Sequence, residues 1–173
     1  ITNAFNLIDN MDGYSVIVTL VTLMVHGIIL HGHGHFLMAL VCCMALGPVL
    51  AFAQWNRPPA KMYLGDAGSL SLGFFVAMLS VASTYYHDGQ SVISILTPLL
   101  VLAIPLFDVA TVMFIRYRLK KPYFLGDHNH FSHRLLKLGL SVPQALAVIF
   151  LLTSTTGLAA IVLQHSNAWE GVC

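Results

Sequence analysis

The chain opens with ITNAFNLIDNMDG (residues 1–13) and continues with YSVIVTLVTLMVHGIILH (residues 14–31), two stretches of opposite character. The first carries three asparagines and two carboxylates, whereas the second is almost wholly apolar. A run of about 18 apolar residues is long enough to cross a bilayer as a helix. We therefore expect the polar opening segment to lie at a membrane surface, at the mouth of a membrane-spanning helix.

The composition of the whole chain supports this interpretation. Of the 173 residues, 57% are hydrophobic and only 9% are charged, and the mean hydropathy of +0.80 is far above that of soluble domains. Five apolar stretches are long enough to be membrane spans, namely residues 14–31, 36–54, 70–86, 92–115 and 143–163. The sequence predicts an all-α, polytopic transmembrane helical bundle in which residues 1–173 form a single domain, which we expect to be a fragment of a longer catalytic domain.

The distribution of cations predicts the orientation of this bundle. All eight Lys and Arg residues fall between spans two and three or between spans four and five, as Arg57, Lys61, Arg116, Arg118, Lys120, Lys121, Arg134 and Lys137. Cytoplasmic loops of membrane proteins keep the Lys and Arg residues. These two loops and the N-terminal segment are therefore predicted to face the cytoplasm together.

Three polar segments thus converge on one predicted membrane face: residues 1–13, 56–69 and 116–139. They hold most of the carboxylates, and Asp108 lies inside the fourth span about two turns from its cytoplasmic end. Carboxylate and amide oxygens suit Mg²⁺, and nearby His and Arg side chains suit phosphate oxygens. The pattern therefore indicates Mg²⁺-assisted chemistry on a phosphorylated substrate at the membrane surface.

Two local patterns refine this expectation. The spacing of three between Asn6, Asp9 and Asp12 predicts one polar stripe on a helix. In LGDAGS (residues 64–69), the two glycines that flank Asp66 and Ala67 allow a backbone to approach a ligand closely, with a helix starting near Ser69.

Taken singly, these residues have simpler explanations. Asn3 or Asn10 alone is more typical of a helix cap, and Asp66 alone is more typical of a turn or an N-cap. A carboxylate inside an apolar helix is costly, so Asp108 indicates a function or a buried partner such as Arg116. The basic run from Arg116 to Lys121 is typical of a lipid anchor, and HNHFSH (residues 128–133) alone is typical of a solvated loop. Independent causes of this kind do not explain why every cluster falls on one face.

Four motifs together resemble a known family. NAFNLIDNMDG, MYLGDAGSLSLG, PLFDV and DHNHFSHRL (residues 3–13, 62–73, 105–109 and 127–135) resemble, in order, the cytoplasmic motifs of the polyprenyl-phosphate N-acetylhexosamine-1-phosphate transferases. The resemblance implies an enzyme of the bacterial inner membrane that transfers a sugar-1-phosphate from a UDP-N-acetylhexosamine to a polyprenyl phosphate and releases UMP. It implies Mg²⁺ as cofactor, membrane lipid as surroundings, no nucleic acid partner, and a homodimer as a candidate assembly.

The resemblance also implies roles for individual residues. Asp66 corresponds to the principal Mg²⁺ ligand, with Asn6 beside the metal or the diphosphate, and Asp9, His130 and His133 are the catalytic candidates. The expected substrate-binding residues are Asn3, Asn6, Asp12, Asp108 and Arg134. Asp12 is expected to hold the uridine, and His130 and His133 are expected to contact the phosphates and sugar of the donor.

The chain departs from the family pattern at two points. Ser132 occupies the position of the middle histidine in the family's H-x-H-H loop, and the adjacent Asp-Asp pair of an early cytoplasmic loop does not occur in this sequence. The residue at Asp108 and the separated histidines favour the branch that uses UDP-GlcNAc over the branch that makes lipid I. The competing hypotheses are a transporter or channel, in which Asp108 and the histidines relay protons or bind a cation, and a structural membrane subunit. Only Asp108 and His26 lie away from the predicted interface.

Overall fold

The chain is built from helices throughout the part that the structure, a computed structural model, describes: residues 1–85, 92–120 and 129–170. Within these ranges there are eight helices and no strand: α1 (Thr2–Ile8), α2 (Tyr14–Gly32), α3 (Phe36–Asn56), α4 (Gly65–Tyr85), α5 (Val92–Val101), α6 (Ala103–Leu119), α7 (Phe131–Lys137) and α8 (Val142–Glu170). The predicted all-α, polytopic membrane fold is confirmed.

Four of the five predicted spans are single long helices. Among the described residues, those in α2, α3, α4 and α8 are long and apolar enough to cross a membrane. The fourth predicted span, residues 92–115, is wrong as a continuous helix, because α5 ends at Val101 and α6 begins at Ala103. Pro105 lies in the first turn of α6, where it has no N–H to donate to Val101 and its ring disfavours a regular helix through that residue.

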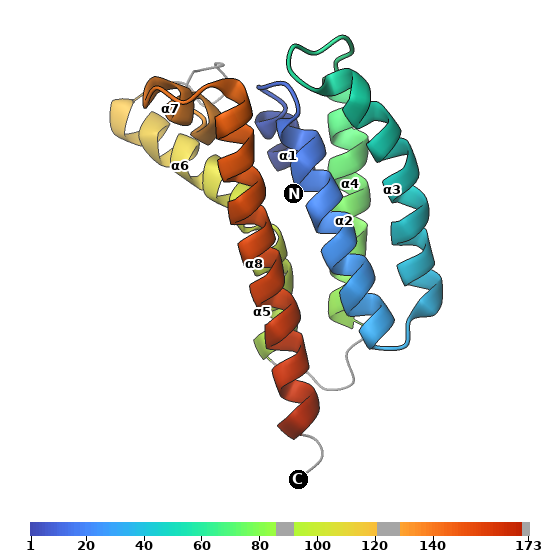
Figure 1. The fold of residues 1–173 in the computed structure, drawn as a ribbon. Coiled ribbons are helices and arrows are strands. Elements are labelled where there is room, and N and C mark those ends of the chain that lie inside the picture. The colour runs from blue at the N-terminus through green and yellow to red at the C-terminus, as the bar shows by residue number, and fades with distance from the viewer. Residues whose placement is uncertain (86–91, 121–128, 171–173) are drawn as a thin grey trace.

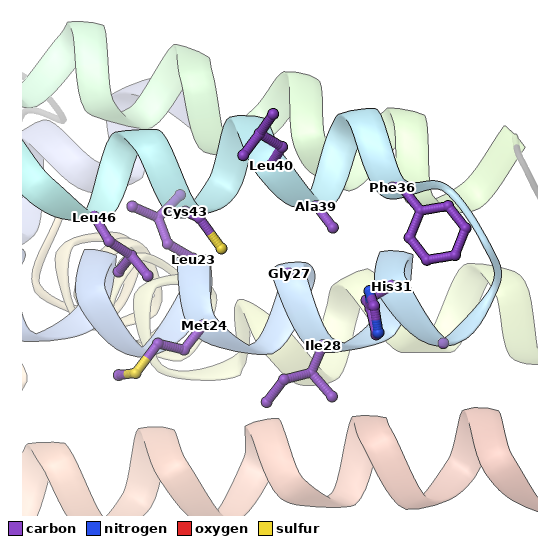
Figure 2. A pocket seen from close by; sticks show the side chains of 11 residues that line it. Leu23, Met24, Gly27, Ile28, His31, Phe36, Ala39, Leu40, Cys43 and Leu46 are labelled. Carbon is purple, nitrogen blue, oxygen red and sulfur yellow. The ribbon is translucent and has the colours of Figure 1, made fainter.

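The break redirects the chain. The ten residues of α5 rise about 15 Å, half of what a bilayer core requires. Figure 1 shows α6 leaving the end of α5 at a steep angle and running outward beneath α7. The first turns of α6 therefore bring Asp108 toward the start of α7, as described below.

The long helices pack around α2. Helix α2 contacts α3, α4 and α8, while α1 lies against α4 and α6. Figure 1 shows α1, α7 and the loop after α3 at one end of the bundle, and the turn between α2 and α3 with the C-terminus at the other end. The predicted convergence of the three polar segments on one face is thus a property of the fold.

A single glycine lets α1 lie directly on α4. A Cβ atom on Gly73 would stand 2.8 Å from both Phe5 Cβ and the backbone oxygen of Thr2, distances that no side chain tolerates. Phe5 and Ile8 are fully buried on this side of α1. The next side chain along α1, Asn6, is held close to the beginning of α4 as a result.

Several local expectations about these helices are wrong. Helix α1 ends at Ile8, so Asp9 and Asp12 do not continue a helical stripe from Asn6. Neither Asn3 nor Asn10 caps a helix start, because the N-cap positions of α1 and α2 are Ile1 and Gly13. Instead, Asn10 Nδ2 donates to the backbone oxygen of Leu7 at 2.7 Å, at the end of α1.

The chain then turns through Gly13, whose φ of +79° is strained for any other residue, and enters α2. Helix α4 begins at Gly65 rather than near Ser69, which places Asp66 in its first turn.

Candidate active site

An acidic cavity of about 340 Å³ lies where α1, α4 and the loop after α3 meet. Its lining is polar on one side and contains three carboxylates but no Lys, Arg or His: Asn6, Asp9, Asn10, Met11, Asp12, Asn56, Tyr63, Leu64, Gly65 and Asp66. Four of the site residues predicted from the sequence, Asn6, Asp9, Asp12 and Asp66, are therefore brought together. A cavity with this excess of negative charge favours a cation.

The two residues predicted to serve the metal are in direct contact. Asn6 Nδ2 donates to Asp66 Oδ1 at 2.9 Å and to Ser69 Oγ at 3.0 Å. Both amide hydrogens are thereby used, so only the carbonyl oxygen of Asn6 can act as a ligand atom. Asp66 is exposed, whereas Ser69 is fully buried and supports Asn6 from behind.

Asp9 lies next to this pair. Its Oδ1 accepts a hydrogen bond of 2.7 Å from Ser15 Oγ. Partial burial raises the pKa of Asp9 above its usual value, hydrogen bonds from the Ser15 hydroxyl and the Gly65 backbone lower it, and the charge of Asp66 raises it. The net shift of the Asp9 pKa is upward, so a cation bound beside Asp9 would stabilise its ionised form.

The far side of the cavity is built by the loop after α3. Asp12 Oδ2 accepts from the backbone N–H of Ala60 at 2.9 Å. Asn56, which is buried, accepts from the N–H of Gly13 at 2.9 Å and donates to the backbone oxygen of Met62 at 2.9 Å. These bonds fix the α1–α2 link to the loop, and Tyr63, which is 74% exposed, offers an aromatic face at the rim.

A buried pair links α6 to α7. His130 Nδ1 lies 3.0 Å from Asp108 Oδ2, and the backbone N–H of Phe131 donates to Asp108 Oδ1 at 2.5 Å. Asp108 is fully buried and His130 is 5% exposed. Asp108 therefore has a buried partner, as expected, but the partner that the structure shows is His130, whereas Arg116 was expected from the sequence. Its contact with substrate stays a prediction.

A second bond ties α7 to the acidic cavity. Ser132 Oγ donates to Asn10 Oδ1 at 2.5 Å, and Ser132 is fully buried. The His133 ring is half-buried, with its centroid 6.4 Å from that of His130, and Arg134 is exposed on the same helix. The described part of HNHFSH is thus anchored to two other segments, which a merely solvated loop would not be.

Some predicted residues stand apart from the cavity. Asn3 is exposed on α1, and it is absent from the cavity lining together with His130, His133 and Arg134. Asp127 and Lys121 lie outside the described residues.

Sequence reasoning missed Asn56, Ser15 and Ser69 as supports of the site. Of these three residues, only Asn56 could have been found from the sequence, because it is a polar residue at the end of an apolar span, immediately before the loop.

The sequence predicts Mg²⁺ at this site, and the structure offers carboxylate and amide oxygens that could hold it. Among the described residues, no group of three or more His, Cys, Asp or Glu side chains is arranged to hold a metal ion. Mg²⁺ usually takes one or two carboxylates and fills its remaining positions with water and substrate phosphates. Asp66, with the Asn6 carbonyl beside it, is a ligand set of that kind.

Comparisons with known proteins agree with the motifs. Residues 1–84 match glycosyl transferase family 4. The chain is 32% identical to a probable undecaprenyl-phosphate N-acetylglucosaminyl 1-phosphate transferase of Bacillus subtilis (strain 168), over 98% of the chain and 47% of the relative. It is 29% identical to the undecaprenyl-phosphate alpha-N-acetylglucosaminyl 1-phosphate transferase of Escherichia coli (strain K12), over 95% of the chain and 46% of the relative.

A further relative matches only one half of the chain. The phospho-N-acetylmuramoyl-pentapeptide-transferase of Clostridium perfringens (strain 13 / Type A) is 42% identical over 81 residues, which are 47% of the chain and 26% of the relative. The polytopic fold and these matches identify a membrane protein of known type, and the chain belongs to glycosyl transferase family 4. The chain spans about half the length of the first two relatives.

Proposed function

We propose that this chain forms part of an enzyme that transfers N-acetylglucosamine-1-phosphate from UDP-GlcNAc to a polyprenyl phosphate and releases UMP. The observation that carries the proposal is the acidic cavity at one end of the bundle, in which Asn6 and Asp66 are in contact. Such a cavity serves a nucleotide diphosphate only together with a cation. Its place at the end of the membrane-spanning helices allows a lipid-borne phosphate to reach the same point.

The residues present fit a magnesium ion. Asp66 would hold it through a carboxylate oxygen, and the Asn6 carbonyl would hold it directly or through water. When bound, Mg²⁺ would neutralise the diphosphate of the donor. Two anions must meet for the transfer, and their repulsion at a low-dielectric membrane face is the obstacle that the site has to overcome.

The remaining residues suit the two ends of the donor. Asp12, Asn56 and Tyr63 border one side of the cavity, where hydrogen-bonding groups and an aromatic face suit a uracil base. His130, His133 and Arg134 offer donors to the charge that develops on the phosphates. The oxygen of the lipid phosphate attacks the β-phosphorus in line, and UMP leaves.

The extent of the alignments supports the choice of donor. The relatives whose names include N-acetylglucosaminyl transfer align over 98% and 95% of the chain, whereas the pentapeptide transferase aligns over 47%. UDP-GlcNAc is therefore the donor we propose, in a bacterial inner membrane with the site on the cytoplasmic face and with a homodimer as the assembly to test.

The transporter hypothesis has less support. His26 is buried in α2, where its Nδ1 lies 2.9 Å from the Thr22 oxygen and its Nε2 lies 3.2 Å from Ser80 Oγ. These contacts tie α2 to α4. Asp108 is likewise paired, so neither residue indicates a transport path.

The test is a transfer assay with the intact protein in membranes. Radiolabelled UDP-GlcNAc and undecaprenyl phosphate are supplied across a Mg²⁺ titration, and label is followed into the lipid phase and UMP into the aqueous phase. Mg²⁺-dependent transfer of sugar phosphate supports the proposal. Transfer from UDP-N-acetylmuramoyl-pentapeptide in preference to UDP-GlcNAc would overturn the choice of donor, and the absence of transfer from any UDP-sugar would overturn the function.

A further inference from the structure

Asp108 is the fully buried carboxylate closest to the histidines of α7. It lies in α6, and both of its oxygens accept hydrogen bonds from residues that begin the α7 segment, His130 and Phe131. Transferring a carboxylate from water to such a place is costly unless all its lone pairs find donors. A leucine or an asparagine would join two helices at lower cost. We therefore look for the reason for a carboxylate at this position in its effect on His130.

The contact decides which ring nitrogen of His130 carries a hydrogen. A carboxylate oxygen is an acceptor, so the contact of 3.0 Å between His130 Nδ1 and Asp108 Oδ2 is a hydrogen bond when the ring hydrogen is on Nδ1. The Nε2 atom is then the nitrogen that remains for a partner outside the pair. The second bond, from the Phe131 N–H to Oδ1, fixes the carboxylate in the orientation that this contact requires.

We propose that Asp108 is a positioning residue for His130: it fixes the Nδ1–H form and the plane of the ring, so that Nε2 is presented to the phosphates of the substrate. Asp108 itself does not touch the substrate. This inference rests on the proposed function and deepens it, because it assigns to Asp108 an indirect role in place of the substrate contact expected from the sequence. His130 remains the catalytic residue of the pair.

A merely structural role for Asp108 would be to hold α6 against α7. The chain offers a control for that role, because Phe107 and Phe131 also join these two helices, with ring centroids 5.9 Å apart in an edge-to-face contact. Phe107→Leu weakens this packing and leaves the hydrogen bonds of His130 in place. Asp108→Asn keeps the size of the side chain but removes its negative charge. His130 Nδ1 then faces either an amide hydrogen or a neutral amide oxygen, and the carboxylate that holds the hydrogen on Nδ1 is gone.

The first experiment reads the ring directly. The intact protein is labelled with nitrogen-15 in its histidines and studied by NMR in lipid, and the difference from His130→Gln assigns the His130 signals. We expect a protonated Nδ1 in the wild type and an altered Nδ1 signal in Asp108→Asn, with Phe107→Leu unchanged. An unprotonated Nδ1 in the wild type would overturn the proposal, and this result does not depend on the folding of any Asp108 variant.

The second experiment compares turnover in a double-mutant cycle. Asp108→Asn is expected to lower kcat by about 10²-fold, as His130→Gln does, with little change in the KM for the donor. The double variant should be no slower than His130→Gln alone, and Phe107→Leu should remain near wild type. Additive losses, or an Asp108→Asn enzyme with wild-type kcat, would overturn the positioning role. A wild-type protein without transferase activity would instead overturn the proposed function.

Discussion

The amide of Asn6 donates a hydrogen bond of 2.9 Å to Asp66 Oδ1, which joins α1 to the first turn of α4 across 60 positions of sequence. The bond has a mechanical cause, since Gly73 lets α1 lie on α4 without an intervening side chain. The same bond holds the side-chain amide of Asn6 beside the carboxylate of Asp66, so two groups that carry oxygen donors lie next to each other. Three of the predictions that follow depend on this arrangement.

The first prediction concerns the charge of Asp66. Asp66→Asn keeps the size of the side chain and its capacity to accept the Asn6 bond, but it removes the anionic ligand proposed for Mg²⁺. We expect the intact variant to be nearly inactive with UDP-GlcNAc and polyprenyl phosphate even at high Mg²⁺. The measurement is transfer of labelled sugar phosphate into the lipid phase across a Mg²⁺ titration.

The control for this variant is Asp88→Asn. Asp88 lies outside the described residues, between the third and fourth predicted spans, and the alternation of the spans predicts it on the opposite side of the membrane from Asp66. The control should therefore behave as wild type. Expression and membrane insertion of both variants are checked first. Wild-type turnover and an unchanged Mg²⁺ requirement in Asp66→Asn would show that Asp66 serves only the start of α4.

The second prediction concerns the close contact of α1 and α4. Gly73→Val places a branched side chain where a Cβ alone would already stand 2.8 Å from Phe5 Cβ, so α1 must move away from α4. We expect a loss of activity of about 10-fold or more, because a displacement of about 1 Å in a positioned group costs up to about 10²-fold.

A matched variant is Gly47→Val in α3, where a new Cβ meets nothing within 4 Å. It should keep wild-type activity and serves to exclude a general effect of valine in a membrane helix. Equal activity of the two variants would mean that the position of α1 does not matter to the site.

The third prediction follows from the raised pKa of Asp9. A carboxyl group whose pKa is higher in the folded state than in the unfolded state binds its proton more tightly when folded, so its ionisation destabilises the fold. Asp9→Asn should therefore raise the Tm of the metal-free protein near neutral pH. The difference from wild type should narrow as the pH falls through the folded-state pKa toward the ordinary value of 3.8.

The measurement is thermal unfolding in detergent at several pH values with a chelator present. Addition of Mg²⁺ should also reduce the difference, since a cation offsets the repulsion between Asp9 and Asp66. A variant that is less stable than wild type at neutral pH would show that the hydrogen bonds from Ser15 and Gly65 outweigh the cost of burial.

The sequence was sufficient to predict the long helices and four of the residues that line the acidic cavity, Asn6, Asp9, Asp12 and Asp66. Hydropathy alone locates α2, α3, α4 and α8, because lipid-facing and core-facing side chains are both apolar and their runs are long. The break at Leu102 was missed because an apolar run looks the same whether its helix is continuous or interrupted. Pro105 was the residue that could have indicated the break, but whether a proline interrupts a helix depends on its position in the helix.

The contacts between distant segments were not predictable in the same way. Asn6, Asp9 and Asp12 were expected on one helix, but α1 ends at Ile8, where Asn10 bonds to the Leu7 oxygen, and a short link leads to α2 at Gly13. These three side chains still line one cavity, because the link between α1 and α2 lies beside the start of α4. Pairs such as Asp108 with His130 depend on the tilt of α6, which no periodicity in the sequence specifies.

The fourth prediction concerns the orientation of the bundle, for which the cations are the sole basis. Gly34 and Lys120 are exposed at the turn between α2 and α3 and at the end of α6, respectively. In a cysteine-free background, Gly34→Cys should react with an impermeant thiol reagent added outside intact cells, and Lys120→Cys should react only after the membrane is permeabilised. The reverse pattern would place the acidic cavity outside the cell, where UDP-sugars are absent.

The last prediction concerns Ser132, the residue that stands where the family pattern has a histidine. Its hydroxyl donates to Asn10 Oδ1 at 2.5 Å, and Asn10 in turn lines the acidic cavity and bonds to the end of α1. Ser132→Ala removes this link between α7 and the cavity and leaves Asn10 without that donor. Loss of a buried hydrogen bond of this kind costs about 1 kcal/mol, which corresponds to about fivefold in an equilibrium.

We therefore expect Ser132→Ala to lower kcat several-fold, far less than His130→Gln, with no change in the Mg²⁺ requirement. Asn10→Ala should cost at least as much, because it also removes the bond to the Leu7 oxygen. The double variant should be no worse than Asn10→Ala, because both substitutions break the bond between Ser132 and Asn10. The control is Ser71→Ala, whose hydroxyl bonds only to Ala67 of its own helix at 2.6 Å among the described contacts. If Ser132→Ala and Ser71→Ala are equally active, α7 is held in place by the Asp108 contacts alone and the serine is a neutral replacement for the histidine.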